Sequence, residues 1–481
     1  MSIWDWLIVT VNYGVLFCFV WHRNTSRPRM TIAAAGAVAM TLLHLACFGW
    51  RWQMTPAYMA ALLTLGCIPF SGRDRYIGGG KKLVMALQSA ALLMLAAVSA
   101  ALPLLMPVFS FVPPSGPYAV GTTVYHWVDE SRAEPYSDNP EDRRELMVQV
   151  WYPAGQAGGK RSPYTRYPQE IAAGLGQTFS LPAFIFSHLG RVKTHAVEEA
   201  QLAAGENRFP VLLFSHGLTG FRNQNTFQVE ELASHGYIVA GIDHTYDAAA
   251  TVFPDGRAAL IRFANLSGFA RLDEHIPLWK DDIRFVLDQV EQLDKEDERF
   301  AGRLDAARIG MFGHSYGGAA AVQMLMDDER IKAAINMDGT LYGDVAPKSG
   351  VGKPLFIMSA EKSLDKAAYD KLAEVAAETT GRSREELEQS WQETVRRRER
   401  ALAGGGFSIV IPNTSHMSFT DFHLFSPLLK NNGEDPRSVQ RTINDFSLAF
   451  FDSYVKQLEG ARAKLDSVAE KYKDVGFALH P

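Results

Sequence analysis

Apolar and polar positions divide the chain into two unlike parts. Residues 4–21, 31–50, 54–70 and 83–109 are four nearly uninterrupted apolar runs, and later residues alternate between short apolar and polar stretches. The runs are apolar on all sides, and runs of about 17–25 residues can cross a bilayer as helices. A cleavable signal peptide would explain only the first run, which lacks preceding basic residues. We therefore predict a transmembrane domain of four helices over 1–112, with a soluble helical bundle as the alternative.

Charges between these runs indicate an orientation. The first and third connections are basic, and they carry Arg23, Arg27, Arg29, Arg73, Arg75, Lys81 and Lys82. The second connection has only Arg51. Because basic loops stay in the cytoplasm, everything after residue 109 is expected on the opposite side, which is the periplasm for a bacterial inner membrane. His44 lies inside the second run, and it is either a packed neutral histidine or a functional intramembrane residue.

The pattern after residue 112 predicts one α/β domain over 113–481. Residues 112–117 are rich in proline and form a linker, and 121–129 and 144–152 predict an antiparallel pair of strands. Parallel strands are then expected at 209–215, 237–243, 308–312, 331–337, 354–359 and 406–411. Helices are expected between them and after them, at 225–235, 279–293, 317–326, 365–403 and 437–459. This alternation predicts a mostly parallel sheet with helices on both faces, in the order of the α/β-hydrolase fold.

A charged stretch interrupts this alternation. Residues 361–403 are longer than an ordinary connection between strands and contain the run Arg396-Arg397-Arg398-Glu399-Arg400. Such a stretch is either a solvated helical face or an insertion that acts as a lid or contacts lipid headgroups. The pattern does not distinguish between these two interpretations.

The clearest chemical motif is Gly313-His314-Ser315-Tyr316-Gly317. It follows an apolar strand and precedes a helix rich in small residues. A serine on such a sharp turn is exposed above the sheet, where the helix N-terminus offers N–H groups to a developing oxyanion. We therefore predict that Ser315 is a nucleophile. In the alternative interpretation it only caps the helix.

A serine nucleophile requires a histidine and an acid further along the chain. His416 lies in a polar loop directly after a strand and is the best base. His423 is a weaker candidate that fits surface packing, and His480 is expected to be disordered near the end of the sequence. The acid is Asp338, one strand after the nucleophile, or else Glu361 or Asp365 after the next strand.

The oxyanion hole requires a second backbone N–H from the loop after an earlier strand. Residues 215–220 form such a loop, and the expected donors are the amides of Leu218 and Tyr316. His216 is expected to brace this loop by hydrogen bonding. The histidines show no metal-ligand spacing, so we expect no metal and no cofactor.

Composition narrows the choice of partners. The net charge of −5 gives no reason to expect a nucleic-acid partner. The three cysteines, Cys18, Cys47 and Cys67, all lie in apolar runs, which argues against a disulfide framework or thiol chemistry in the catalytic domain. The expected partners are a bilayer, because of the apolar runs, and a lipid or small ester substrate, because the predicted nucleophile Ser315 would lie next to that bilayer.

Several motifs in order resemble the platelet-activating-factor acetylhydrolases. They are Phe214–Leu218, Leu232–Ala240, Gly313–Ala319, Asn336–Gly339 and His416 followed by Asp421-Phe422. The resemblance covers roughly residues 117–425. It implies a calcium-independent α/β-hydrolase that cleaves short or oxidised acyl esters, typically at the sn-2 position of phospholipids. It also implies that Asp338 is the acid and that Leu218 and Tyr316 are the oxyanion donors.

The chain departs from the animal members of that family in two ways. It has the N-terminal apolar runs, and its interval between Ser315 and His416 is longer because of the charged stretch. We expect a membrane-anchored serine esterase. The alternatives are a hydrolase or acyltransferase acting on non-phospholipid esters, of dienelactone-like or xenobiotic type, and a catalytically dead membrane sensor.

Overall fold

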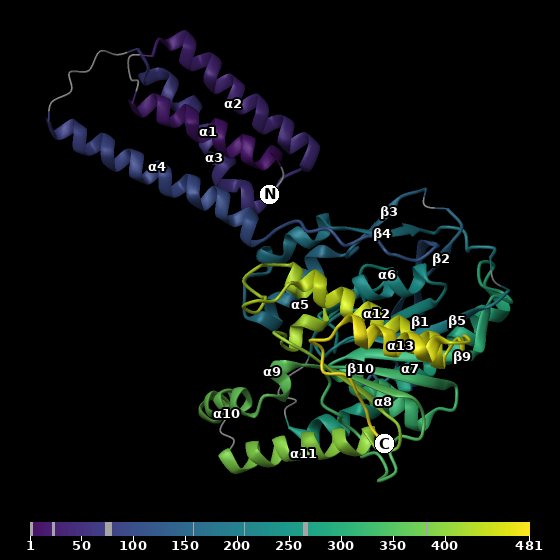
Figure 1. Ribbon diagram of the computed structural model, residues 1–481. Coiled ribbons are helices and arrows are strands. Elements are labelled where there is room, and N and C mark those ends of the chain that lie inside the picture. The colour runs from purple at the N-terminus through teal and green to yellow at the C-terminus, as the bar shows by residue number, and fades with distance from the viewer. Residues whose placement is uncertain are drawn as a thin grey trace. The chain divides into compact units, whose positions relative to one another are not determined.

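Two compact units make up the chain. The computed structural model describes residues 3–21, 25–72, 79–156, 158–205, 207–262, 268–380 and 383–481 (Figure 1). One unit is Met1–Phe109 with Leu424–Leu428, and the other is Ser110–His423 with Leu429–Pro481. We call them the N-terminal unit and the hydrolase unit.

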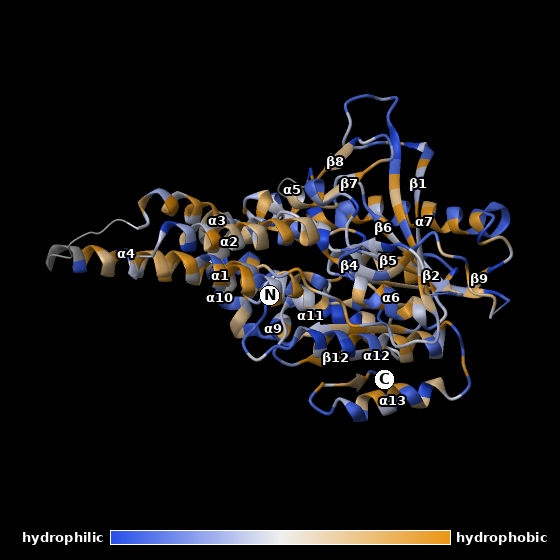
Figure 2. Ribbon diagram, turned by 90° about the horizontal axis from the view of Figure 1, so that it is seen from above, coloured by the Kyte–Doolittle hydropathy of each residue, from blue (hydrophilic) through white to orange (hydrophobic). Residues whose placement is uncertain are grey.

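The N-terminal unit is helical. Its helices are α1 (Ile3–Trp21), α2 (Arg27–Phe48), α3 (Thr55–Cys67) and α4 (Gly79–Leu105), with 3₁₀ turns η1 (Trp52–Met54) and η2 (Ile68–Phe70) flanking α3. Figure 2 shows these helices coloured mostly as hydrophobic. Within the described residues, three helices are long and apolar enough to cross a membrane, namely Ile3–Trp21, Arg27–Phe48 and Lys82–Leu105. The 13 residues of α3 extend only about 20 Å, so this helix alone falls short of the length that we predicted for it.

A polar cluster lies inside this helical unit. His44 is buried, and its Nε2 lies 3.0 Å from Asp5 Oδ1 while its Nδ1 lies 3.3 Å from the Tyr58 hydroxyl. Arg51 donates to the same Asp5 oxygen. Asn12 donates to Thr41 at 3.1 Å. His44 is therefore packed within a hydrogen-bonded network that joins three helices and the loop before α3.

A large mixed sheet forms the centre of the hydrolase unit. In its described part the order is β13-β12-β11-β10-β9-β5-β6-β2-β1-β4-β3. The six strands from β12 to β6 run parallel, and β2 joins β6 in antiparallel fashion. The strands are β1 (Ala119–Ala133), β2 (Arg143–Ala154), β3 (Arg161–Pro163), β4 (Lys193–Glu198), β5 (Phe209–Ser215), β6 (Ile238–Asp243), β9 (Leu304–His314), β10 (Ile331–Met337), β11 (Leu355–Ala360), β12 (Phe407–Ile411) and β13 (Ala478–Leu479), beside the hairpin β7 (Ala250–Val252) and β8 (Ala258–Leu260).

Helices cover both faces of this sheet because its central strands are buried on both sides. The helices α7 (Phe269–Glu296), α8 (Tyr316–Asp327) and α11 (Arg384–Leu402) pack on one face. On the other face lie α6 (Thr226–Ser234), α12 (Pro436–Tyr454) and α13 (Ala461–Lys471) (Figure 1). The remaining elements are α5 (Pro168–Phe179), η3 (Ala183–Arg191), α9 (Glu361–Leu364), α10 (Lys366–Thr380), η4 (His416–Phe419) and η5 (Asp421–Leu424).

The predicted α/β-hydrolase sheet is confirmed, and the differences concern the helices and the edges. The expected helix 279–293 is the second part of α7, which begins ten residues earlier and contains Pro277. The expected helix 365–403 is divided into α10 and α11, and residues 381–382 lie outside the described residues. The expected closing helix 437–459 is shorter, since α12 ends at Tyr454 and a separate helix, α13, begins after Gly460, whose left-handed φ of 73° interrupts a helical path.

The prediction that His480 is disordered is wrong, because this residue is ordered and lies beside strand β12. Its backbone N–H donates to the Gly406 carbonyl at 2.9 Å, and its Nε2 lies 2.8 Å from the Ser408 hydroxyl. The final residues thus add the antiparallel strand β13 to the sheet edge.

Candidate active site

Ser315 stands at a strained turn between β9 and α8. Its φ of 54° and ψ of −121° are unusual for a residue with a side chain. The backbone holds this turn because the Ser315 N–H donates to the Met337 carbonyl of the neighbouring strand at 2.9 Å. The Ser315 carbonyl accepts from the Ala319 N–H in the first turn of α8. Strand and helix together fix the serine at the carboxyl edge of the sheet.

Glycine is required on both sides of this serine by close backbone contacts. A Cβ on Gly313 would lie 2.2 Å from the Gly317 carbonyl oxygen. A Cβ on Gly317 would lie 2.1 Å from the Ser215 carbonyl oxygen at the end of β5. Both obstacles are backbone atoms that cannot move aside, which explains the glycine spacing of the motif.

His416 reaches Ser315 from the loop after β12. Its Nε2 lies 2.9 Å from Ser315 Oγ. Beneath it, buried His314 donates from Nε2 to the His416 carbonyl at 2.9 Å and accepts on Nδ1 from Gln224. Burial lowers the pKa of His314 to about 3, with a smaller contribution from His416. A permanently neutral imidazole therefore supports the backbone of His416.

Asp338 lies on the other side of His416, at the end of β10. Its Oδ2 is 2.8 Å from His416 Nδ1 and accepts from the Ser363 hydroxyl at 2.7 Å. Its Oδ1 accepts from the Ala360 N–H at 2.8 Å. Burial by itself would raise the pKa of Asp338, but the hydrogen bonds from His416, Ser363 and Ala360 hold that pKa below its usual value. The carboxylate therefore remains ionised at neutral pH.

The other acids and histidines considered from the sequence are engaged elsewhere. Glu361 accepts from the Asn413 N–H at 2.8 Å, and Asp365 accepts from the Ala367 N–H at the start of α10. His423 is buried and lies 2.7 Å from Glu434, so it is not a surface residue. The structure therefore brings together Ser315, His416 and Asp338 and leaves these alternatives apart from them.

The expected oxyanion loop follows β5 and lies against the serine turn. Within the described residues, neither the Leu218 N–H nor the Tyr316 N–H donates to a protein acceptor. The neighbouring N–H groups are occupied, because Thr219 donates to the Asp247 carbonyl and Gly220 to the Gly217 carbonyl. Two unused N–H groups beside a serine are what an oxyanion hole requires.

His216 braces this loop, as expected. Its Nδ1 donates to the Gly217 carbonyl at 2.7 Å, and its Nε2 accepts from the His244 N–H at 3.2 Å. Burial lowers the pKa of His216 to about 3, so the ring is neutral. It serves as a fixed support behind the loop.

A buried polar network behind the loop was not foreseen. His244 Nε2 lies 2.9 Å from the Ser215 hydroxyl, and its Nδ1 lies 3.0 Å from Asp282. Arg144 binds Asp282 through two hydrogen bonds of 3.0 and 2.7 Å. The sequence contained a signal that could have identified Asp282 as buried, because it falls on the apolar stripe of α7 three residues after the buried Trp279. A carboxylate in such a position requires a buried partner.

Solved structures identify the class of the hydrolase unit. A ferulic acid esterase from Streptomyces cinnamoneus is 27% identical, with a TM-score of 0.58, and the match covers 76% of this chain and 98% of that one. Together with the sheet order, this likeness makes the protein a carboxylic ester hydrolase of the α/β-hydrolase fold.

The family follows from the sequence comparisons. The family described as platelet-activating factor acetylhydrolase, isoform II, matches residues 109–262 and 286–474. A platelet-activating factor acetylhydrolase of Cavia porcellus is 26% identical over 383 residues, which is 71% of this chain and 77% of that protein. A probable 1-alkyl-2-acetylglycerophosphocholine esterase of Arthroderma benhamiae is 28% identical over 256 residues, which is 50% of this chain and 61% of that protein. The chain belongs to this family.

Proposed function

We propose that the protein is a membrane-anchored serine esterase that hydrolyses short-chain or oxidised acyl esters, including the sn-2 ester of phospholipids. The observation that carries the proposal is the continuous chain of hydrogen bonds from Ser315 through His416 to Asp338, at 2.9 and 2.8 Å. The acyl preference and the phospholipid substrate come from the family.

The geometry supports acyl transfer through a covalent intermediate. His416 Nε2 accepts the Ser315 proton as Oγ attacks the ester carbonyl, and Asp338 stabilises the resulting imidazolium. The Leu218 and Tyr316 amides donate to the oxyanion. His416 then returns the proton to the leaving alkoxide and activates the water that releases the acid. No step requires a metal or a cofactor.

Contacts inside the N-terminal unit favour four membrane crossings. The segment from Arg51 to Gly72 begins where Arg51 binds Asp5, at the start of α1. It ends beside Arg27, where a Cβ on Gly72 would lie 3.6 Å from the Arg27 nitrogen. We therefore propose that η1, α3 and η2 together cross the bilayer, although α3 alone is too short.

With four crossings, both basic connections lie at one end of the helices. The positive-inside rule then puts that end in the cytoplasm and the hydrolase unit on the opposite side, which is periplasmic for a bacterial inner membrane. Anchoring at a bilayer favours a lipid ester as substrate.

The test is hydrolysis by the full-length protein in detergent micelles. Wild type is expected to cleave 4-nitrophenyl acetate and a phospholipid with an acetyl group at sn-2, and to lose activity as the acyl chain lengthens. Ser315→Ala should lose at least about 10⁴-fold in kcat on every ester, because it removes the nucleophile. Ser187→Ala, at an exposed serine whose hydroxyl donates to the Phe184 carbonyl, is the matched control. Full activity of Ser315→Ala would refute the proposal.

A second candidate is an esterase for non-phospholipid esters. The observation that favours it is the likeness to the ferulic acid esterase, whose match covers nearly all of that chain. A larger kcat/KM on methyl ferulate than on the acetyl phospholipid would select this candidate. Product analysis with an added alcohol separates transfer from hydrolysis. A fluorophosphonate probe that fails to label Ser315 would point to the dead sensor.

A further inference from the structure

Helix α11 carries three consecutive arginines that have different surroundings. Arg396 forms two hydrogen bonds to Glu393 on the same helix. Arg397 is buried and binds Asp273, Glu393 and the carbonyls of Leu341 and Gly343. These contacts fix α11 on the hydrolase unit, so the orientation of the third arginine is fixed as well.

Arg398 lacks such a partner. It makes one hydrogen bond, from Nη1 to the Ser359 hydroxyl at 2.7 Å, and within the described residues it forms no ion pair. Its side chain is half-buried. Burial lowers the pKa of Arg398 to about 10, against the effect of the Asp338 charge, so the guanidinium remains positive at neutral pH. A half-buried cation with unused donors has a strong tendency to bind an anion.

Arg398 lines a cavity of about 410 Å³ between α11 and the final residues of the chain. Most of the wall is apolar and is formed by Leu364, Trp391, Val395 and Leu402. His480 is also in the wall, and burial together with the Arg398 charge lowers its pKa, so it is neutral at pH 7. Glu399 and Pro481 also line the cavity, and both are exposed to solvent, which screens the Glu399 charge. The cavity therefore offers one half-buried cation, one exposed carboxylate and a mostly apolar surface.

We propose that this cavity binds a carboxylate with a short aliphatic chain, held by the Arg398 guanidinium with its chain against Trp391 and Leu364. A guanidinium matches a carboxylate through two parallel hydrogen bonds, and a single cation suits a singly charged headgroup. The proposed esterase prefers acetyl esters but also releases longer acids of this class, so the site would take its own longer-chain product. The identification of the ligand as the product rests on the proposed function, whereas the binding site itself does not.

The site is connected to the proposed catalytic acid. Arg398 contacts Ser359, the next residue Ala360 donates to Asp338, and Ser363, beside Leu364 of the cavity wall, also donates to Asp338. A ligand in the cavity therefore touches the segment that holds Asp338 in place. This arrangement suits feedback by product on the reaction.

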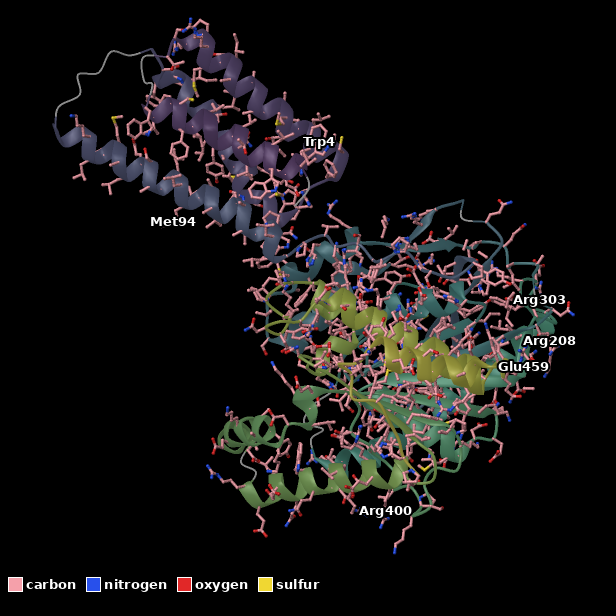
Figure 3. All side chains as sticks on the ribbon, viewed as in Figure 1. Trp4, Met94, Arg208, Arg303, Arg400 and Glu459 are labelled. Atoms are coloured by element: carbon pink, nitrogen blue, oxygen red, sulfur yellow. The ribbon has the colours of Figure 1, made fainter. Side chains whose placement is uncertain are left out.

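The experiment measures binding without using activity. Isothermal titration of the full-length protein in non-ionic detergent, with octanoate as the probe, is performed on wild type, Arg398→Gln and Arg400→Gln. Arg400 lies on the same helix (labelled in Figure 3) and outside the cavity, so its variant has the same net charge. Arg398→Gln should bind octanoate at least about tenfold more weakly, because one charge-assisted pair is lost. Arg400→Gln should bind like wild type.

Two further measurements separate the contributions that the charge and the aliphatic chain of the ligand make to binding. Acetate and octanol should each bind at least about tenfold more weakly than octanoate to wild type, because one lacks the chain and the other the charge. Val395→Trp should fill the cavity from its exposed wall and abolish binding while Arg398 remains, which covers the case in which Arg398→Gln does not fold. Equal octanoate affinity in wild type, Arg398→Gln and Val395→Trp would overturn the proposal. An inactive protein that still binds octanoate through Arg398 would refute only the proposed function.

Discussion

Replacement of Asp338 by asparagine keeps the shape of the acid but changes which atoms can accept a hydrogen bond. The Ala360 N–H donates to Oδ1 at 2.8 Å, so that position must remain an oxygen. The new amide nitrogen then faces His416 Nδ1 and donates to it. Because a neutral imidazole has one N–H, the proton moves to Nε2. There it faces Ser315, and His416 cannot accept the serine proton.

The expected loss in kcat of Asp338→Asn follows from two free-energy costs. Turning the new side-chain amide over restores the productive His416, but the buried Ala360 N–H then faces an NH₂ group, which costs about 1–3 kcal/mol. Replacing the carboxylate beside the imidazolium by a neutral amide costs about 1–2 kcal/mol more in the transition state. Together these give about 2–5 kcal/mol, which is a loss in kcat of about 30- to 5,000-fold.

The assay is steady-state hydrolysis of 4-nitrophenyl acetate. The KM of Asp338→Asn should stay near that of wild type, because Asp338 acts through His416 and not on the ester. Asp365→Asn is the matched control, since the Asp365 carboxylate accepts from the Ala367 N–H and, among the residues that the structure describes, forms no hydrogen bond or ion pair with His416. A kcat of Asp338→Asn within threefold of wild type, or an equal loss in Asp365→Asn, would refute the reasoning.

Three further predictions concern the turn, a buried acid and the membrane. Gly317→Ala forces a Cβ to 2.1 Å from a backbone carbonyl, so esterase activity should be lost and the thermal midpoint should fall, whereas Gly158→Ala, with nothing within 4 Å, should behave like wild type. Burial raises the pKa of Glu230 from 4.5 to about 7. The contribution of Glu230 to stability should therefore be largest below pH 4.5 and fall by up to about 3 kcal/mol as the pH rises to 7, so the stability of wild type relative to Glu230→Gln in thermal unfolding should fall over this range. In a cysteine-free background, an impermeant maleimide should label Asp138→Cys in intact cells and Ser26→Cys only after permeabilisation; the reverse would refute the orientation.

The parts of the candidate site that could be predicted from the sequence depend on a short local motif and on the order of the strands. The pentapeptide around Ser315 specifies its own turn, because the two glycines are required by contacts within a few residues or with the adjacent strand. Strand order then places the loops that carry Asp338 and His416 at the same edge of the sheet. Topology predicts the positions of Ser315 and His416 and limits the acid to the loops after the next two strands, and the family resemblance then selects Asp338 over Glu361 and Asp365.

The features that could not be predicted from the sequence depend on contacts between distant parts of the chain. Ser363 and Ala360 hold Asp338 across 25 and 22 residues, and no periodicity in the sequence marks such a pair. The order of His480 depends on Ser408, 72 residues earlier. The region predicted as one helix over 54–70 consists of α3 and flanking 3₁₀ turns, because hydropathy cannot show where an α-helix gives way to a 3₁₀ turn.

The charged insertion shows why a long interval between serine and histidine does not disturb the site. Ser315 and His416 are 101 residues apart, yet β11 and β12, which flank the insertion, are paired from Phe356 with Phe407 to Ala360 with Ile411. That register fixes both ends of the insertion, so its length changes only the entropy of a closed loop, which grows slowly with length. The insertion is therefore free to acquire structure of its own. Arg397 holds helix α11 of the insertion on the hydrolase unit through Asp273. This fixed helix places Arg398 directly behind the segment that holds Asp338.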